Sequence, residues 1–449
     1  MDKDKNQNEM RKEIGIEEKL TVGQSLFYGV QSVISLNLFL GAIIIAGILQ
    51  MDVIGTAILI TLSFLASGIS TLIQAGLFMK YPIVQGVSFV TIGALCAVAF
   101  THDLATAFGS LILGAVILIA LGQFKLFGYI MKVIPPIVAG LVIMLIAVNV
   151  GYIAIDGLIT APGNVGGNFM LAAIAFVLIL VFKTIGNTRW RIATICGRGG
   201  VLFAIIIAVV IAALTGQADF SIVAQASWVS APPFFHFGFP KFDLASSLVF
   251  IVVYIITMIE TIGGWFAISH TAKVPITKKD IDKGIVGEGI SCVIAAFVGS
   301  APVTSYATNA GVISITKVYS RWAAVGAGVI IVVLSFIPKL MYLIASIPVP
   351  ILLGVLIALC ASMFGSGLRS IHRYPITERN FLIITVPIFL TLLANMLPMS
   401  IIGAMPMLLS YFFSSSICIG AVSAIILNLV LPKAPEDRAL EANESGHLE

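Results

Sequence analysis

Long stretches without a charged side chain limit the folds open to this chain more than any other feature. Residues 25–51, 104–124 and 380–432 contain no Asp, Glu, Lys or Arg. A helix needs about 20 apolar residues to cross the hydrocarbon core of a bilayer. The runs lack the strict alternation of a porin strand, which indicates helices rather than a β-barrel. We therefore expect an all-α polytopic membrane protein.

The composition also indicates a lipid environment. Of the 449 residues, 59% are hydrophobic and 10% are charged, whereas soluble domains carry about 25% charged residues. The five cysteines are scattered without a CxxC or CxxH spacing, so we expect no metal site, disulfide framework or cofactor. The net charge of +4 gives no indication of a nucleic-acid partner.

Hydropathy predicts fourteen transmembrane segments. Two of them, 85–100 and 309–318, are too short to cross as full helices, and Pro406 is expected to break the last one. The predicted segments are 26–50, 54–79, 85–100, 104–122, 128–150, 168–183, 199–215, 244–269, 285–299, 309–318, 322–346, 348–366, 379–396 and 401–431.

The distribution of Lys and Arg predicts the orientation. The loops 151–167, 216–243 and 300–305 hold one basic residue between them, Lys241, whereas the loops on the other side are rich in Lys and Arg. By the positive-inside rule, both termini are expected in the cytoplasm of a multi-pass protein of the cell (plasma or inner) membrane. The predicted divisions are a cytoplasmic tail 1–24, seven-span halves 25–215 and 244–432 around an extracellular loop 216–243, and a cytoplasmic tail 433–449.

Two short motifs recur in the same order at nearly one offset. Residues 68–75 (GISTLIQA) resemble 289–296 (GISCVIAA), and 134–140 (IPPIVAG) resemble 347–354 (IPVPILLG). A proline also precedes each short segment. Since seven spans is an odd number, the two halves must be inverted relative to each other. Inverted repeats with paired interrupted segments indicate a transporter with its site near the bilayer midplane.

Glu260 is the most informative single residue, because the run 244–269 holds no other charged side chain. A carboxylate at that depth is costly and usually marks a pathway, a proton relay or a ligand contact. A protonated glutamate bonded to a neighbouring helix is the structural alternative. Glu288, by contrast, follows Lys283 near the expected cytosolic end of its span. We interpret it as a solvated end charge.

Four further polar or aromatic residues are candidates near the same site. Gln31 could face the cavity from the first span, or could bond to a neighbouring helix. Phe89 could stack on a planar ring, or could belong to the core. Thr308 and Asn309 begin the second short segment, where they could also cap the half-helix that follows.

The segment 308–317 (TNAGVISITK) resembles the signature of the nucleobase/ascorbate transporter family, Asn-x-Gly followed by Thr and a basic residue. Other landmarks of that family match in order, and together they cover about residues 25–432. They are Gln31-Ser32 where a first-span Gln-His is usual, 85–89 (QGVSF) in the third span, 134–140 at the fifth, and 260–263 (ETIG) in the eighth.

The resemblance implies a fold of seven plus seven inverted spans, with a core domain, a gate domain and short antiparallel strands in the third and tenth spans. It also implies a homodimer. Glu260 is implied as the ion-coupling residue. The implied substrate-binding residues are Glu260, Phe89, Ala307, Thr308, Asn309, Gln31 and Ser88.

Two positions depart from the family pattern. Thr308 stands where a Gln or Glu normally bonds the base directly, and Gly264 replaces a polar or acidic residue one helical turn after Glu260. The second change removes a candidate proton-coupling group. The context 260–269 (ETIGGWFAIS) resembles the purine-type members more than the uracil type.

We therefore predict a secondary active transporter, not an enzyme, that imports a nucleobase by elevator-type alternating access. A purine such as xanthine, urate or guanine is favoured, with H⁺ or else Na⁺ as the coupling ion. A uracil permease of the same family is the alternative. A sulfate- or bicarbonate-type anion transporter is disfavoured because Glu260 would repel an anion. A membrane enzyme would need clustered His, Asp or Ser side chains, and a channel could not accumulate its substrate.

Overall fold

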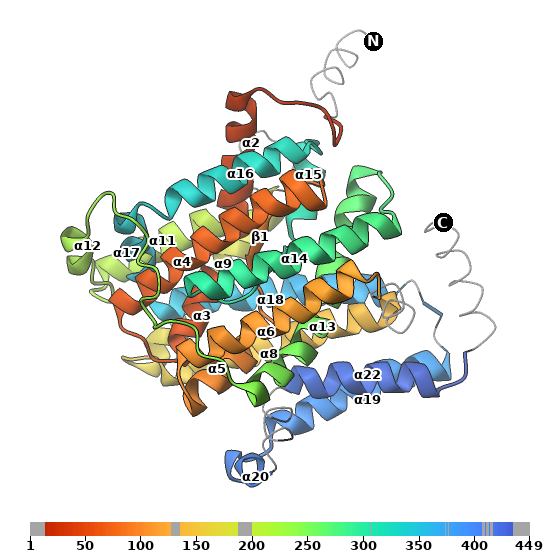
Figure 1. Cartoon of the computed structure of the whole chain (residues 1–449). Coiled ribbons are helices and arrows are strands. Elements are labelled where there is room, and N and C mark those ends of the chain that lie inside the picture. Colours follow the sequence, from red (N-terminus) through yellow and green to blue (C-terminus); the bar gives the residue numbers. More distant parts are fainter. Residues whose placement is uncertain are drawn as a thin grey trace.

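The computed structural model describes residues 14–433 except 127–134, 187–199, 307, 373, 376, 406–408, 410–412, 414 and 415. Its elements are almost all helices (Figure 1). In chain order they are α2 (Val22–Leu36), α3 (Leu40–Ile48), α4 (Val53–Thr71), the π-helix η1 (Leu72–Phe78), β1 (Gln85–Val87), α5 (Ile92–Thr101), α6 (Leu104–Gln123), α8 (Pro136–Thr160), α9 (Val165–Gly186), α11 (Gly200–Leu214), α12 (Ser221–Gln225), α13 (Leu244–Ala272), α14 (Lys278–Val298), β2 (Val303–Ser305), α15 (Thr308–Thr316), α16 (Arg321–Leu334), α17 (Pro338–Ala345), α18 (Val349–Ile371), α19 (Glu378–Asn395), α20 (Met399–Gly403) and α22 (Ser416–Val430).

Seven of the described helices are long and apolar enough to cross a membrane, and the bent pair α16 and α17 would make eight. The prediction of a mostly helical, polytopic membrane protein with two short strands is therefore confirmed. Fewer full spans appear among the described residues than the fourteen predicted segments, because several segments are interrupted, α11 is short and α14 carries several charges.

The interruptions have local causes. The predicted span 26–50 is divided into α2 and α3, because Asn37 adopts the left-handed conformation (φ 49°) that ends α2. The predicted span 322–346 bends by 87° between α16 and α17, where Pro338 begins the second helix. The predicted span 401–431 coincides with two separate helices, α20 and α22. Pro406, which was expected to break this span, lies outside the described residues.

One predicted loop is partly wrong. Residues 151–160 are not part of an outer loop, because α8 continues to Thr160. The helix continues because this stretch contains no proline and only one charged residue, Asp156, so nothing in it breaks the helical hydrogen bonds. The predicted span 128–150 is accordingly displaced towards the C-terminus.

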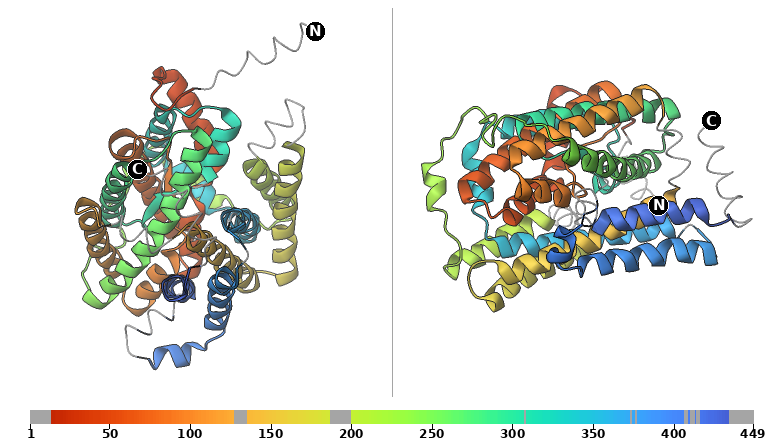
Figure 2. Two further views of the ribbon diagram at one scale, coloured as in Figure 1. Left: turned by 90° about the vertical axis from the view of Figure 1, so that its right-hand side faces the viewer. Right: turned by 60° about the horizontal axis from the view of Figure 1, so that its bottom comes forward.

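The helices pack as two sets. In the first set, α14 lies against α4 and α6, and α16 lies against α2 and α4. In the second set, α18 lies against α8 and α9, and α19 lies against α22. The right-hand view of Figure 2 shows the blue helices α19 and α22 beside the yellow α8 and α9, below the helices of the first set.

The two copies of each repeated motif fall within the same set of helices. Residues 68–75 lie in α4 and η1, and 289–296 lie in α14, both within the first set. The prolines of the other motif begin α8 and α18, which contact each other in the second set. Their backbones approach so closely that a Cβ on Gly367 would lie 2.5 Å from the Gly140 carbonyl oxygen.

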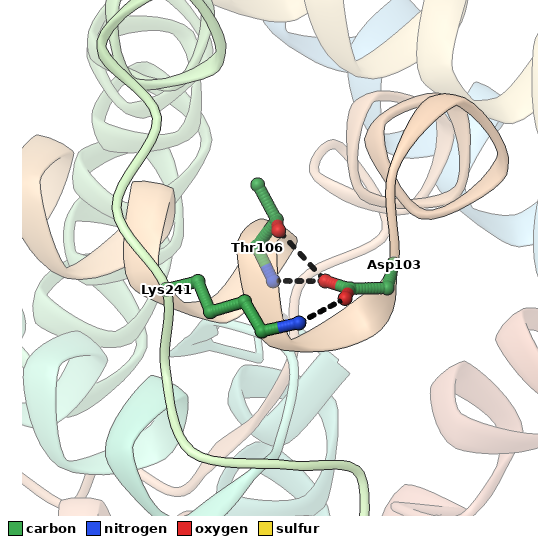
Figure 3. A network of polar contacts seen from close by, with 3 residues as sticks. All are labelled: Asp103, Thr106 and Lys241. Carbon is green, nitrogen blue, oxygen red and sulfur yellow. Dashed lines mark hydrogen bonds and ion pairs between the residues drawn. The ribbon is translucent and has the colours of Figure 1, made fainter.

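The end of the predicted outer loop 216–243 is anchored to α6. Lys241 Nζ donates to Asp103 Oδ2 at 2.6 Å, and Asp103 Oδ1 accepts from the backbone and hydroxyl of Thr106, each at 2.7 Å (Figure 3). The hydrogen bond from Lys241, followed by those from Thr106, lowers the pKa of Asp103 to about 2. Asp103 therefore caps the N-terminus of α6 and holds the loop against it.

Candidate functional site

The two interrupted segments meet as a pair of antiparallel strands. Gln85 pairs with Ser305, Gly86 with Thr304, and Val87 with Val303, so the strands expected in the third and tenth segments are present. The pairing extends beyond the strands, since the Ser88 N–H donates to the Pro302 carbonyl at 2.8 Å. Backbone at membrane depth needs such partners because no water is available.

Two aromatic rings cover this strand pair. Phe89 and Tyr306 stack with ring centroids 6.0 Å apart and planes 21° apart, and the Tyr306 hydroxyl donates to the Val87 carbonyl at 3.1 Å. The ring of Tyr306 packs directly over Gly86, where a Cβ would lie 2.5 Å from Cζ of the ring. Tyr306 therefore belongs to the site with Phe89. Tyr306 was not among the site residues predicted from the sequence, although it lies between the strand residue Ser305 and the signature 308–317.

Glu260 lies beside this aromatic pair, on the long helix α13. Its carboxyl interacts with the Ser88 side chain, and its charge acts on the Tyr306 hydroxyl. No described residue forms a well-aligned hydrogen bond to Glu260 Oε2 or to Ser88 Oγ, and both atoms are buried. A buried carboxyl oxygen without a partner costs free energy unless a proton or a ligand satisfies it.

Glu288 corrects the sequence interpretation, because it is fully buried rather than solvated. Its Oε2 accepts from Gln74 Nε2 at 2.6 Å and from Gln85 Nε2 at 2.9 Å, and its Oε1 accepts from the Thr261 hydroxyl at 3.4 Å. Proximity to Lys283 in sequence was misleading, since α14 turns the two side chains to different sides. The helical repeat alone could not have revealed these partners, because they come from η1, β1 and α13.

Glu288 therefore holds the site's elements together. Gln85 belongs to β1, and Thr261 directly follows Glu260 on α13. Gln74 belongs to η1, and its amide also donates to the Gly284 carbonyl at 2.8 Å. Single π-helical turns often occur at functional sites. All of these side chains present donors to Glu288, an arrangement that suits an ionised carboxylate, which only accepts hydrogen bonds.

Asn309 links the two interrupted segments rather than capping its own helix. Its Nδ2 donates to the Pro82 carbonyl at 2.7 Å, while its Oδ1 is buried without a partner in the described structure. Gln31 lines a cavity of about 10 Å³, room for about one water, together with Asn309 and Pro82; Glu260 is not among the residues around it. Thr308 begins α15, its side chain is not described, and Ala307 lies outside the described residues.

Six of the fifteen buried polar atoms that have no hydrogen-bond partner in the described structure lie in or beside the elements around the strand pair. Within the part of the chain that the structure describes, they include atoms of η1, both strands and the helices α13 and α15. These atoms are Gln74 Oε1, Gln85 Oε1, Ser88 Oγ, Glu260 Oε2, Ser305 Oγ and Asn309 Oδ1. Native proteins rarely leave such groups unpaired, so the cluster indicates a place where a polar ligand or water binds. Together with the Phe89 and Tyr306 rings, it suits a flat, polar molecule.

Comparison with known proteins identifies the family. A family model described as a permease family, and named for xanthine and uracil permeases, matches residues 23–400. "Putative purine permease CPE0397" of Clostridium perfringens (strain 13 / Type A) is 31% identical, over 95% of this chain and 94% of that protein. A "Uracil permease" of Paenibacillus larvae subsp. larvae is also 31% identical, over 82% of this chain and 86% of that protein.

A solved structure shares the fold. "The transmembrane domain of a cyanobacterium bicarbonate transporter BicA" matches with a TM-score of 0.62 at 17% identity, over 85% of this chain and 98% of that one. At this identity the match concerns the fold alone. The family match spans most of the chain, residues 23–400. The chain therefore belongs to the xanthine/uracil permease family, whose members are transporters rather than enzymes.

Proposed function

We propose that this chain is an ion-coupled importer of a nucleobase, and that the base is a purine such as xanthine, urate or guanine. The observation that supports this best is Glu260 Oε2, which is buried without a well-aligned hydrogen bond to any described residue and lies beside the stacked rings of Phe89 and Tyr306. A carboxylate oxygen accepts the ring N–H groups of a nucleobase, and aromatic rings bind its flat faces.

Ser88, Asn309 and the backbone at Ala307 and Thr308 would contact the polar edges of the base. Ser88 Oγ and Asn309 Oδ1 have unused hydrogen-bonding capacity in the described structure. The hydroxyl of Thr308 is shorter than the Gln or Glu usual at that position. It would reach the base through water or leave room for a larger ring system. The preference for a purine over uracil rests on residues 260–269, since a relative named for purine and one named for uracil have the same identity of 31%, over 95% and 82% of this chain.

Coupling to an ion follows from the position of Glu260. A charged carboxylate inside the membrane is costly, so its protonation or a neighbouring cation would accompany substrate binding. A carrier state favoured by both substrate and ion couples their movements. We propose H⁺ as the coupling ion, with Na⁺ as the alternative.

The proposed architecture is fourteen segments in two inverted halves, 25–215 and 244–432. The core domain would comprise the helices that pack with α4 and α14, and the gate domain those that pack with α8 and α18. Movement of the core along the gate would give elevator-type alternating access. The packing of the helices in two sets and the fold shared with BicA support this division. We further propose a homodimer with both termini in the cytoplasm.

Uptake measurements test the proposal. Radiolabelled xanthine, urate, guanine and uracil are supplied to cells that lack their own carriers, with Glu260→Gln as the test variant. Asp156→Asn, which changes an exposed acid on α8, is the matched control. We expect accumulation of a purine that Glu260→Gln abolishes and Asp156→Asn leaves unchanged. If Glu260→Gln accumulates the base at the wild-type rate, Glu260 is not the central residue.

An inorganic anion is the second candidate, because a bicarbonate transporter shares the fold. The negative charge of Glu260 at the strand pair argues against it, since like charges repel strongly where water is excluded. Bicarbonate and sulfate uptake, measured in the same cells, would separate the two functions. Uptake of these anions without uptake of any base would favour the anion transporter.

A further inference from the structure

Residues 14–18, a short segment ahead of α2, dock onto the link between α15 and α16. Ile14 forms a parallel β-bridge with Val318. The Ile14 N–H donates to the Lys317 carbonyl at 3.1 Å, and the Ile14 carbonyl accepts from the Tyr319 N–H at 2.9 Å. A segment that was predicted only as part of the N-terminal tail thus pairs with backbone at the end of α15, the helix that carries the family signature.

The contact continues along the segment. The Arg321 N–H donates to the Ile16 carbonyl at 3.0 Å, and the Ser320 hydroxyl donates to the Glu18 carbonyl at 2.7 Å. The Ile16 side chain is buried against the core. Residues 318–320 are buried and lie outside both helices, so their backbone groups need partners other than those of a helix. The segment supplies these partners.

Arg321 extends the contact to η1. Its Nε lies 3.2 Å from Glu17 Oε2, and its Nη1 donates to the Gly76 carbonyl of η1 at 3.3 Å. Gln74, also in η1, donates to the buried carboxylate of α14. The segment 14–18 therefore reaches two elements next to the candidate site: it reaches α15 directly and η1 through one arginine.

The position of α15 depends on contacts at its two ends, because a helix of nine residues owes its stability to tertiary packing. At its beginning, the Asn309 amide donates to the Pro82 carbonyl at 2.7 Å. At its end, Lys317 leaves the helix with a left-handed backbone (φ 61°), and its carbonyl accepts from Ile14. The helix also packs against α13 and α2. Since a short helix moves as a rigid body, a contact at its end helps to fix its beginning.

We propose that residues 14–18 form a brace that positions α15 for substrate binding. Ile14 is then a positioning residue for the base, a role that rests on the proposed function. A base bound at the beginning of α15 and the brace docked at its end favour the same position of this helix. By linkage, each strengthens the other by the same factor. Loss of the brace should therefore weaken base binding, although Ile14 lies at the opposite end of α15 from the residues proposed to bind the base.

Hydrogen exchange of the purified full chain, followed by mass spectrometry, tests the brace without a ligand. Ile14→Pro removes the N–H that donates to Lys317. Lys19→Pro is the matched control, because Lys19 is exposed and its N–H donates to no described residue. We expect peptides that cover α15 to exchange about fivefold faster in Ile14→Pro, the factor that corresponds to one typical hydrogen bond. The same peptides should exchange at the wild-type rate in Lys19→Pro.

Equilibrium binding of radiolabelled xanthine, urate, guanine and uracil to the same proteins tests the effect on the site. We expect Ile14→Pro to raise the dissociation constant of the bound base between about twofold and about fivefold, with an unchanged number of binding sites. A merely structural loss would lower the number of sites and leave the dissociation constant of the remaining protein unchanged. In the wild type, a saturating base should slow exchange of the Tyr319 N–H by the same factor, a measurement that needs no variant.

Three results would overturn the proposal. Equal exchange of the α15 peptides in Ile14→Pro and the wild type would show that the segment does not hold this helix. Faster exchange with an unchanged dissociation constant would show that the brace does not act on the site. An equal effect of Lys19→Pro would assign the change to proline itself. If the wild type binds none of the four bases, the proposed function fails, while the exchange rates still decide whether the brace holds α15.

Discussion

Replacement of Glu288 gives the sharpest test of how the site is assembled. Gln74 and Gln85 both donate to Glu288 Oε2, in a region without access to solvent. Glu288→Ala leaves one N–H of each amide without its acceptor, while the Gln74 amide keeps its hydrogen bond to the Gly284 carbonyl. A buried donor left without a partner costs about 1–3 kcal/mol, so the two together should cost about 2–6 kcal/mol of stability. The relief of a buried charge offsets part of this cost.

Glu288→Gln should behave differently, because both amides donate to the same oxygen. A glutamine carbonyl placed where Oε2 lies keeps both hydrogen bonds, and its NH₂ group then faces the Thr261 hydroxyl, which can accept. The loss is the difference between charged and neutral hydrogen bonds, about 1 kcal/mol for each of the two. We therefore expect stability to decrease in the order wild type, Glu288→Gln, Glu288→Ala.

The assay is the thermal midpoint of the detergent-solubilised protein, followed by size-exclusion chromatography with fluorescence detection. At roughly 2 °C per kcal/mol, Glu288→Ala should lower the midpoint by roughly 4–12 °C. Asp156→Ala, an exposed acid on α8, is the control and should change stability by less than about 0.5 kcal/mol. If Glu288→Ala has the same thermal midpoint as the wild type, or if Glu288→Gln is as unstable as Glu288→Ala, then hydrogen bonds to the Glu288 carboxyl oxygen do not stabilise the position of β1.

Three further outcomes are expected. Gly86→Ala places a methyl group against the Tyr306 ring, so substrate affinity measured by titration should fall, and unchanged affinity would contradict the described ring position. Asn309→Ala removes the buried donor to the Pro82 carbonyl. The loss should cost about 1–3 kcal/mol of stability and lower the thermal midpoint. A substitution at a helix end that makes no contact with Pro82 serves as the comparison. The pKa of Asp103 is lowered to about 2 from 3.8, so its contribution is present above about pH 4 and is lost as the pH falls towards 2. Because this pair is exposed, Lys241→Gln should cost less than about 1 kcal/mol, measured as a midpoint shift that disappears in high salt.

Some elements of the candidate site could be predicted from local features of the sequence. The two short segments were recognisable from their length and from the prolines that precede them, and their strands do pair. Glu260 was recognisable because a lone carboxylate within an apolar run is rare. Tyr306 and Glu288 were not recognised as site residues. An aromatic residue near a strand is common, and a glutamate near a lysine is usually solvated.

By itself the sequence identified a membrane protein and the class of its fold, and it predicted a carboxylate deep in the membrane, because hydrophobic length and uncharged runs are local properties. The tertiary structure decided which residues meet. Gln74, Gln85 and Thr261 reach Glu288 from three elements, and each is separated from it by 27 or more residues. No periodicity connects such positions, since only the packing of η1, β1 and α13 around α14 brings them together. The same packing buries Glu288 within the candidate site, whereas the sequence predicted a solvated charge at the end of a span.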